Sequence, residues 1–277
     1  MSDFVRHNAV TTDFDTSDSW VILSPIEQSI KRKIEAVGVP LKDWDINIYR
    51  GVLTGYNEAF IISTEKRDEI LSKCQTTEER QRTEELIRPI LRGRDIKRYG
   101  YDWAGLWLIN THNGIKGKLE RIHVEDYPAV KAFLDQYWDK ISTRADKGDT
   151  PYNLRNCAYL DDFSKPKIVY QELCRRGSAF SLDLENNFLG NTGYLLTSNS
   201  MSTSELEQLC MLLNSQIALY QLDVVCTKFD ETGWRWLRQF VEDIRLPKSL
   251  TEWRTAFGFT TEEIKFISSK YTHVLPD

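Results

Sequence analysis

The sequence predicts an α+β fold in which a twisted sheet of mixed, mostly antiparallel strands is flanked by helices. Three observations indicate this class. Segments with a helical apolar period occur at several places along the chain, short strand-like segments lie between them, and the regular strand–helix alternation of a doubly wound fold is missing. With 277 residues, of which 41% are hydrophobic and 12% aromatic, the chain is large and apolar enough to bury a full core.

The first helix is expected after a polar arm of about twenty residues that has no apolar period. Ser24, Pro25 and Glu27 form the pattern of a capping box with proline at the first helical position. A helix should therefore begin here and run to about Val37, where Gly38 stops it.

The next segment should form two strands joined by a glycine-bearing turn. Ile48 belongs to the first strand, and residues 59–62 form the second. Gly51 and Gly55 lie in the connection, and two glycines so close together allow the backbone to approach another part of the chain. A charged, capped helix over 76–87 follows and ends at Pro89.

The remaining elements follow from apolar spacing. After a loop comes a strand at 106–109, and then the clearest helix, which begins at Pro128 and ends near Gly148. Strands are expected at 167–173, 179–182 and 194–197, a long helix at 204–220 and a tail helix near 262–267. We therefore divide the chain into an arm with a connector helix (1–41), a main domain (42–250) and a helical tail (251–277).

Composition excludes several classes of protein. The cysteines, at positions 74, 157, 174, 210 and 226, are odd in number and form no C-x-x-C pair, which argues against a disulfide framework and a zinc ribbon. No run of apolar residues is long enough to span a bilayer and no signal peptide is evident, so a cytoplasmic location with no membrane partner is expected. The net charge of −5 is unusual for a DNA-binding protein. It does not exclude DNA binding, because a protein can bind DNA through one basic face while its total charge is negative.

A search for catalytic motifs finds no glycine-rich phosphate or dinucleotide loop, no Asn-Pro-Pro-Tyr type loop and no zinc-protease or hydrolase signature. Glu263-Ile264-Lys265 has the spelling of part of a nuclease site, but it falls in the tail helix with no strand around it. No catalytic residue and no metal ligand is assigned.

Four loops carry the side chains that duplex recognition requires. Cations neutralise phosphates, whereas arginine and amide side chains match the hydrogen-bonding edges of bases. A single charged loop is usually only solvated surface, but several loops interleaved with Tyr and Asn favour binding. Asp95 could orient Arg94 or Arg98. The candidates for DNA contact are Arg50, Asn57, Arg92, Arg94, Lys97, Arg98, Arg144, Lys147, Asn153, Arg155, Arg175 and Arg176.

The order of motifs from Lys42 to Pro247 resembles the TaqI-like C-terminal specificity domain of type II restriction-modification enzymes and adenine-specific DNA methyltransferases. The motifs that carry the resemblance are PLKDWDINIYRGVLTGYNEAFIIS, IRPILRGRDIKRY, YPAVKAFLDQYWDKISTRADKGDTPYNLRNCAY, KPKIVYQEL, GNTGYLLTS and LCMLLNSQIALY.

The resemblance implies a target-recognition domain that reads double-stranded DNA beside a methyltransferase or endonuclease domain of the same or an adjacent polypeptide. It implies no cofactor in this chain, since S-adenosylmethionine, and Mg²⁺ where the parent enzyme also cuts, would bind to the catalytic domains. We expect phosphate contacts from most of the cations, and base contacts or loop fixation from Asn57, Asn153 and Arg155.

Two alternatives stay open. The chain could be a nuclease or methyltransferase with an unrecognised site. It could also be a protein-interaction module or scaffold in which exposed tryptophans such as Trp103 and Trp236 act as anchors.

Overall fold

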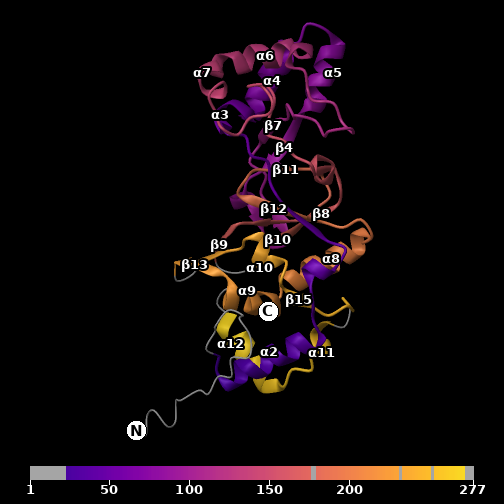
Figure 1. Ribbon diagram of the computed structural model, residues 1–277, viewed down its shortest axis with the longest axis vertical. Coiled ribbons are helices and arrows are strands. Elements are labelled where there is room, and N and C mark those ends of the chain that lie inside the picture. The colour runs from indigo at the N-terminus through magenta and orange to yellow at the C-terminus, as the bar shows by residue number, and fades with distance from the viewer. Residues whose placement is uncertain (1–22, 176–178, 231–232, 251–252, 272–277) are drawn as a thin grey trace.

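A computed structural model describes residues 23–175, 179–230, 233–250 and 253–271. The molecule is elongated and has three tiers along its long axis (Figure 1): helices with a small sheet at the top, a central sheet, and a second group of helices at the bottom. The predicted α+β class is confirmed, although the strands form several small sheets and not one large sheet. None of the helices in the described ranges is long and apolar enough to cross a bilayer.

The central sheet has the strand order β10-β8-β12-β2, with antiparallel neighbours throughout. Its two faces contribute to different hydrophobic cores because side chains alternate along a strand. In β8, Ile168 and Tyr170 belong to the lower core and Val169 to the upper one. Leu195 likewise faces the upper core. The strands are β2 (Asn47–Arg50), β8 (Lys167–Gln171), β10 (Phe180–Asp183) and β12 (Gly193–Thr197).

A fully buried ion pair joins two strands of this sheet. Lys167 and Asp183 are register partners in β8 and β10, their charged atoms lie 2.6 Å apart, and neither side chain is exposed. Burial lowers the pKa of Lys167, although Asp183 opposes this shift. Asp183 also accepts hydrogen bonds from Tyr101 and Asn187, so its charge is well compensated.

The upper tier is built around the sheet β11-β4-β7-β3, in which β11 and β4 are parallel and the other neighbours are antiparallel. Its strands are β3 (Ile61–Ser63), β4 (Ile87–Leu91), β7 (Leu106–Ile109) and β11 (Phe188–Leu189). Its helices are α3 (Asn57–Phe60), α4 (Thr64–Ser72), α5 (Thr77–Leu86), α6 (Pro128–Leu134) and α7 (Trp138–Ile141), with 3-10 turns η3 (Val124–Asp126) and η4 (Asp135–Tyr137).

The lower tier packs helices against the other face of the central sheet (Figure 1). Its elements are α2 (Pro25–Val37), α8 (Thr203–Leu213), α9 (Gln216–Val225), α10 (Arg238–Val241), α11 (Trp253–Ala256), α12 (Thr261–Tyr271), η1 (Leu41–Asp43), and the strand pair β1 (Val39–Pro40) with β15 (Arg245–Leu246).

Smaller elements border the central sheet. A three-stranded antiparallel sheet has the order β13-β14-β9, and a hairpin pairs β5 with β6. The elements are β13 (Thr227–Asp230), β14 (Gly233–Arg235), β9 (Leu173–Arg175), β5 (Ile96–Lys97) and β6 (Gly100–Tyr101), with 3-10 turns η2 (Gly93–Asp95) and η5 (Leu160–Ser164).

Several local predictions are confirmed. The capping box of α2 is present, because Ser24 donates from its backbone N–H and its hydroxyl to the Glu27 carboxylate. The charged helix over 76–87 and the strand at 106–109 are also present. The polar arm of 1–22 lies outside the described residues.

Other predictions are wrong in their bounds. Residues 57–60 form helix α3, so only the end of the segment 59–62 is strand. The segment after α5 is strand β4, which contains Pro89, and not a loop. The helix from Pro128 ends at Ile141 in three short pieces. The helix at 204–220 is two helices, because the Ser215 hydroxyl accepts from the Ala218 N–H and starts a new one.

The connector and tail helices pack into the same lower core as the central sheet. Ile30 and Ile34 of α2 and Ile267 and Tyr271 of α12 are all buried there. The boundaries drawn at 41 and 251 stay predictions.

Candidate nucleic-acid interface

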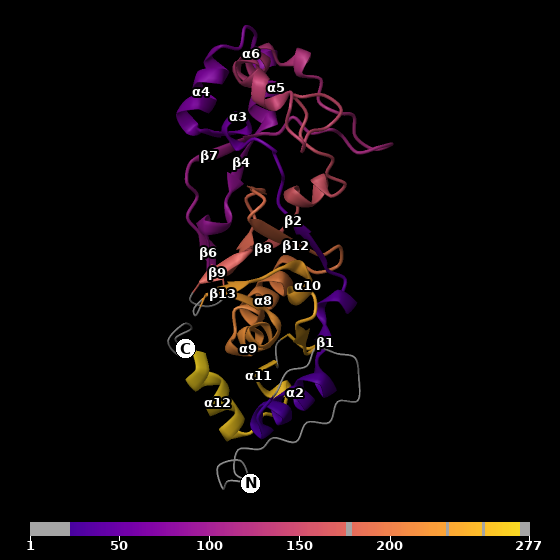
Figure 2. The same cartoon turned by 60° about the vertical axis from the view of Figure 1, so that its left-hand side comes forward.

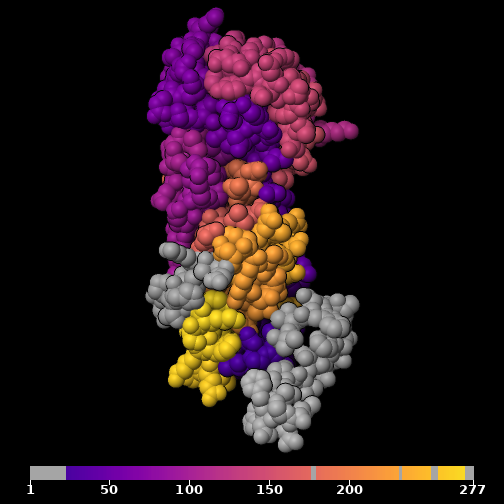
Figure 3. Space-filling view, turned by 90° about the vertical axis from the view of Figure 1, so that its left-hand side faces the viewer, coloured from indigo at the N-terminus to yellow at the C-terminus, as the bar shows by residue number. Residues whose placement is uncertain are grey.

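An open cleft of about 800 Å³ lies between α3 above and the strands β9 and β14 below. Figure 3 views the molecule from this side, where the surface steps inward between the indigo and purple segment around α3 and the orange of the central sheet. We call it the arginine cleft. Its polar lining comprises Arg50, Asn57, Glu58, Arg92, Arg94, Gln171, Glu172, Asn191, Thr192 and Arg235.

Close backbone contacts bring these segments together. A Cβ atom on Gly51 would lie 2.2 Å from the carbonyl oxygen of Gly190, and one on Gly93 would lie 2.4 Å from that of Thr192. The chain therefore needs glycine at both positions, directly beside Arg50 and Arg92. The expectation that the Gly51 connection allows a close approach is confirmed.

A buried carboxylate joins two arginines of the cleft. Glu172 accepts from Nη2 of Arg50 at 2.6 Å through one oxygen and from Nε of Arg235 at 2.9 Å through the other. The Glu172 side chain is 6% exposed, whereas the two arginines are about half exposed, at 50% and 52%. Each guanidinium group is therefore fixed at one edge and open at the other.

Arg92 is held in a similar way by Asp95. Nε of Arg92 lies 3.0 Å from one carboxylate oxygen and Nη2 lies 2.7 Å from the other. This hydrogen bonding raises the pKa of Arg92. The expectation that Asp95 orients Arg94 or Arg98 is wrong, because Asp95 turns back to Arg92 at the start of η2.

Two further cleft residues are exposed. Arg94 extends from η2 into solvent. Asn57, at the start of α3, accepts a hydrogen bond from the Thr54 hydroxyl through Oδ1. Its amide nitrogen donates to no other residue in the described part of the chain, so Asn57 combines a fixed orientation with a free donor.

Three other candidates lie near the cleft but do not line it. Lys97 donates to the carbonyl of Arg94, and Arg98 donates to the carbonyl of Asn214 at the end of α8. Arg175 pairs with Asp230 at 2.8 Å. Because Leu173 of the cleft and Arg175 are two residues apart in β9, Arg175 extends the same exposed strand face.

Arg144 and Asn153 are buried and act as scaffold. Arg144 is 7% exposed, donates to the carbonyls of Thr54, Pro151 and Asn153, and stacks 4.2 Å from the Phe60 ring. Burial lowers its pKa to about 10. The predicted phosphate contact by Arg144 is therefore not supported.

Asn153 is 1% exposed and fixes its loop, which was one of its two predicted roles. Its amide nitrogen donates to the Ile122 carbonyl at 2.8 Å, and its oxygen accepts from the Thr150 hydroxyl at 2.6 Å.

Lys147 and Arg155 lie away from the arginine cleft. Lys147 donates to the Ser142 carbonyl, and Arg155 pairs with Asp146 at 3.2 Å and lines a separate pocket, which has Arg50 in common with the arginine cleft. Figure 2 shows the loops between α7 and β8 on the opposite flank from β4 and β6. Arg176 lies outside the described residues.

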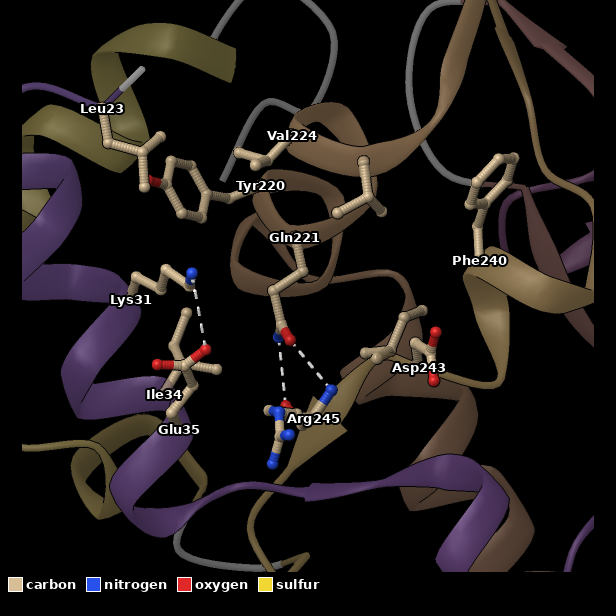
Figure 4. Close-up of a pocket in the computed structure, with 12 residues that line it drawn as sticks. Leu23, Lys31, Ile34, Glu35, Tyr220, Gln221, Val224, Phe240, Asp243 and Arg245 are labelled. Atoms are coloured by element: carbon tan, nitrogen blue, oxygen red, sulfur yellow. Dashed lines mark hydrogen bonds and ion pairs between the residues drawn. The ribbon is translucent and has the colours of Figure 1, made fainter. Parts of the chain in front are cut away.

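Another pocket, of about 160 Å³, lies in the lower tier between α2, α9 and α10 (Figure 4). Its walls include Leu23, Tyr220, Val224 and Phe240, and Gln221 forms two hydrogen bonds with the backbone of Arg245. None of the predicted DNA-contact residues lines it.

Two residues that the sequence analysis weighed for function, Glu263 and Trp236, are buried. Glu263, from the motif that resembles part of a nuclease site, pairs with Lys33 of α2 at 2.7 Å. Trp236 is fully buried, so its expected role as an exposed anchor is wrong, whereas Trp103 is 41% exposed. Within the described ranges, no group of three or more His, Cys, Asp or Glu side chains is placed to hold a metal ion.

Arg235 and Glu172 were missed by sequence reasoning. Arg235 stands between Trp234 and Trp236, which are both buried, so the alternation of β14 places the arginine on the outer face. That pattern could have revealed it. Glu172 gives no local signal, because its partners are 122 and 63 residues away.

Comparison with solved structures shows the same fold in two restriction enzymes. The type IIL restriction-modification enzyme MmeI, solved in complex with DNA, aligns with a TM-score of 0.52 and 12% identity over 74% of this chain and 24% of its own. The type IIG restriction endonuclease BpuSI aligns with a TM-score of 0.52 and 15% identity over 88% of this chain and 27% of its own. The chain thus spans about a quarter of each enzyme. A search of curated proteins gave no match.

The model of the TaqI-like C-terminal specificity domain matches residues 88–232, which is more than half of the chain. The chain belongs to this family, and the resemblance inferred from its motifs is confirmed. The matched range contains Arg92, Arg94 and Glu172, whereas Arg50 and Arg235 lie outside it.

Proposed function

We propose that this protein recognises a specific sequence of double-stranded DNA through the arginine cleft. The observation that carries the proposal is the convergence of four arginines and an exposed asparagine, from β2, α3, η2 and β14, on one open surface. Only two carboxylates, Glu58 and Glu172, line the same cleft within the described part of the chain. The cleft is therefore locally cationic although the whole chain carries a net charge of −5.

The chemistry of the lining fits a duplex. Guanidinium groups neutralise phosphates and match guanine, and the Asn57 amide suits adenine. Arg94, which is exposed on η2, has the environment of a phosphate contact. Carboxylates fix the orientation of the other three arginines, Arg50, Arg92 and Arg235, and a fixed orientation suits contact with a base edge.

The catalytic step would belong to a methyltransferase or endonuclease domain of the same or an adjacent polypeptide. S-adenosylmethionine, and Mg²⁺ for an enzyme that also cuts, would bind there and not in this chain. The family and the fold shared with MmeI and BpuSI support this division of roles. We expect the protein to act in the cytoplasm, where its DNA substrate would be accessible.

Salt-dependent binding tests the proposal. Arg94→Ala should weaken binding to all duplexes alike and lower the slope of log affinity against log salt concentration by about one unit, because one phosphate contact is lost. The measurement is fluorescence anisotropy with labelled duplexes over a range of salt concentrations.

Arg32→Ala is the matched control, because it removes the same charge from the exposed surface of α2 in the lower tier. It should leave both affinity and slope unchanged. The proposal fails if the wild-type chain shows no salt-dependent binding to duplex DNA, or if the two variants behave alike.

A further inference from the structure

We propose that Arg50 and Arg235, held by Glu172, read guanine at neighbouring positions of the DNA target. This inference rests on the proposed function and makes it more specific. The two arginines are far apart in the sequence, yet one carboxylate orients both.

The remaining donors of each arginine suit guanine. In Arg50, Nε donates to the carbonyl of Asn191 at 2.7 Å and Nη2 donates to Glu172. In Arg235, Nε and Nη2 both lie 2.9 Å from the same Glu172 oxygen. Among the described residues, none accepts a hydrogen bond from Nη1 of either arginine. In each arginine, Nη1 and the second hydrogen of Nη2 therefore remain available as a pair of adjacent donors that faces the cleft.

Guanine is the base that matches this donor pair. Its N7 and O6 atoms are two adjacent acceptors in the major groove, and bidentate contact by arginine distinguishes it from the other bases. Adenine presents a donor at the corresponding position and would face another donor.

The environment favours a base contact over a phosphate contact. A phosphate contact depends mainly on charge, and the charge of Glu172 offsets part of that of the two arginines. A base contact depends on the orientation of the guanidinium group. The Glu172 carboxylate restricts the orientation of both guanidinium groups and so favours such a contact. Arg94, whose side chain is exposed, shows the contrasting environment in the same cleft.

The backbone around Glu172 is also fixed. Its N–H donates to the Thr192 carbonyl at 2.9 Å, and its own carbonyl accepts from the Trp236 N–H at 2.8 Å. Glu172 thus connects the strand that carries Arg235 with the turn that contacts Arg50. Because both arginines bond to one carboxylate and base pairs stack about 3.4 Å apart, the two guanines should lie at neighbouring positions.

The test begins with selection of binding sequences from a randomised duplex library by the 277-residue chain and its variants. The wild-type chain should select a motif with neighbouring guanines. Arg50→Lys and Arg235→Lys keep the charge but lose the pair of adjacent donors. Each should relax the preference at one guanine, by roughly 5- to 100-fold, with unchanged affinity for random duplex.

Glu172→Gln should relax both positions and raise affinity for random duplex, because a negative charge leaves the cleft. Loss of selectivity at both positions without loss of affinity is the result that a merely structural role would not give. If this variant does not fold, the two lysine variants still decide the question, since both arginine side chains are about half exposed.

Replacing each selected guanine by 7-deazaguanine tests the same contact from the DNA side. This base keeps Watson–Crick pairing but lacks the N7 acceptor, so it should weaken wild-type binding and have less effect on the lysine variant that has already lost that contact. Arg94→Lys is the protein control and should leave the selected motif unchanged.

The inference is overturned if the motif lacks guanine, or if the lysine variants lower the affinity for all sequences alike. In both cases the proposed function stands. Absence of any salt-dependent binding by the wild-type chain would instead overturn the proposed function itself.

Discussion

Arginine side chains have two different environments in this protein. Those at Arg50 and Arg235 are fixed at one edge and half exposed at the other, whereas Arg144 is enclosed and donates only to backbone carbonyls. The first environment is suited to a ligand. The second stabilises the loop that follows α7, because Arg144 donates to the carbonyls of Thr54 and Pro151, and shares that of Asn153 with the Gly148 N–H.

Arg144→Ala should lower the free energy of unfolding by about 2–4 kcal/mol, because it removes the donor to the Thr54 and Pro151 carbonyls and opens a cavity beside Phe60. Arg155→Ala, in the same loop but exposed, should change the free energy of unfolding by less than about 0.5 kcal/mol. Urea denaturation followed by circular dichroism measures both. A stable Arg144→Ala variant with a reduced salt slope in DNA binding would contradict the scaffold role.

The sequence did not distinguish these two arginines. Both belong to the segment RADKGDTPYNLR, which mixes cations, amides and an aromatic residue as a binding loop would. Burial separates them, and the burial of Arg144 depends on Thr54 and Phe60, which lie far earlier in the chain. Residue types and spacing therefore found a structured polar loop but not the direction of its side chains.

At the scale of elements, the arginine cleft depends on how closely η2 approaches the turn before β12. Gly93→Ala would place a methyl group 2.4 Å from the Thr192 carbonyl oxygen, and one of the two backbone segments would have to move. The variant should lose about 1–3 kcal/mol of stability and some DNA affinity.

Gly100→Ala is the matched control for Gly93→Ala. A Cβ atom there meets nothing within 4 Å, and Gly100 lies in β6, a short distance further along the chain. In thermal unfolding, the melting temperature of Gly93→Ala should be clearly lower than that of Gly100→Ala. Equal melting temperatures would show that the contact between η2 and the turn does not restrict this position.

Elements with local signals were predicted well. The cap at Ser24 depends on residues within one turn, so the sequence reveals it directly, and apolar spacing located the helices that begin near 128 and 204 but not where they end. The break at Ser215 was missed because the apolar period continues across it, although a serine cap interrupts the backbone. Strand β4 was missed because Pro89 suggested a loop, whereas β7 and β11 both pair with this segment.

The site was predicted in part for the same reason. Arg50, Asn57, Arg92 and Arg94 were candidates because each lies in a polar, glycine-bearing loop, and the structure brings them to one cleft. Which of the four loops share a surface is a property of tertiary structure. Arg155 lines a different pocket from the arginine cleft. The part that Glu172 plays depends on Arg50 and Arg235, which lie far from it in the sequence.

At the scale of the whole molecule, the central sheet makes the two cores depend on each other. Leu195→Ala removes a fully buried side chain from the upper face of β12, between two residues that face the lower core. It should lower the stability of the whole chain by about 2–5 kcal/mol.

Hydrogen exchange measured by mass spectrometry can check this dependence. Peptides that cover β7 in the upper tier and α9 in the lower tier should lose protection together in the Leu195→Ala variant. Leu119→Ala, at a leucine that is 40% exposed, is the control and should leave the protection of both peptides unchanged. Loss of protection in the upper tier alone would show that the tiers unfold independently.

The pairing of β1 with β15 has a consequence for how this unit can be joined to other domains. Val39 lies opposite Leu246 and Pro40 opposite Arg245, so the segment between them, which carries the central sheet and the upper tier, begins and ends at adjacent points. A segment with adjacent ends can be replaced by another without separating the elements on either side of it, which here are α2 and α12. Junctions at 39 and 246 would keep this strand pair but remove α2 and α12, whose Ile30 and Ile267 are buried in the lower core, whereas junctions outside 25–271 would keep both.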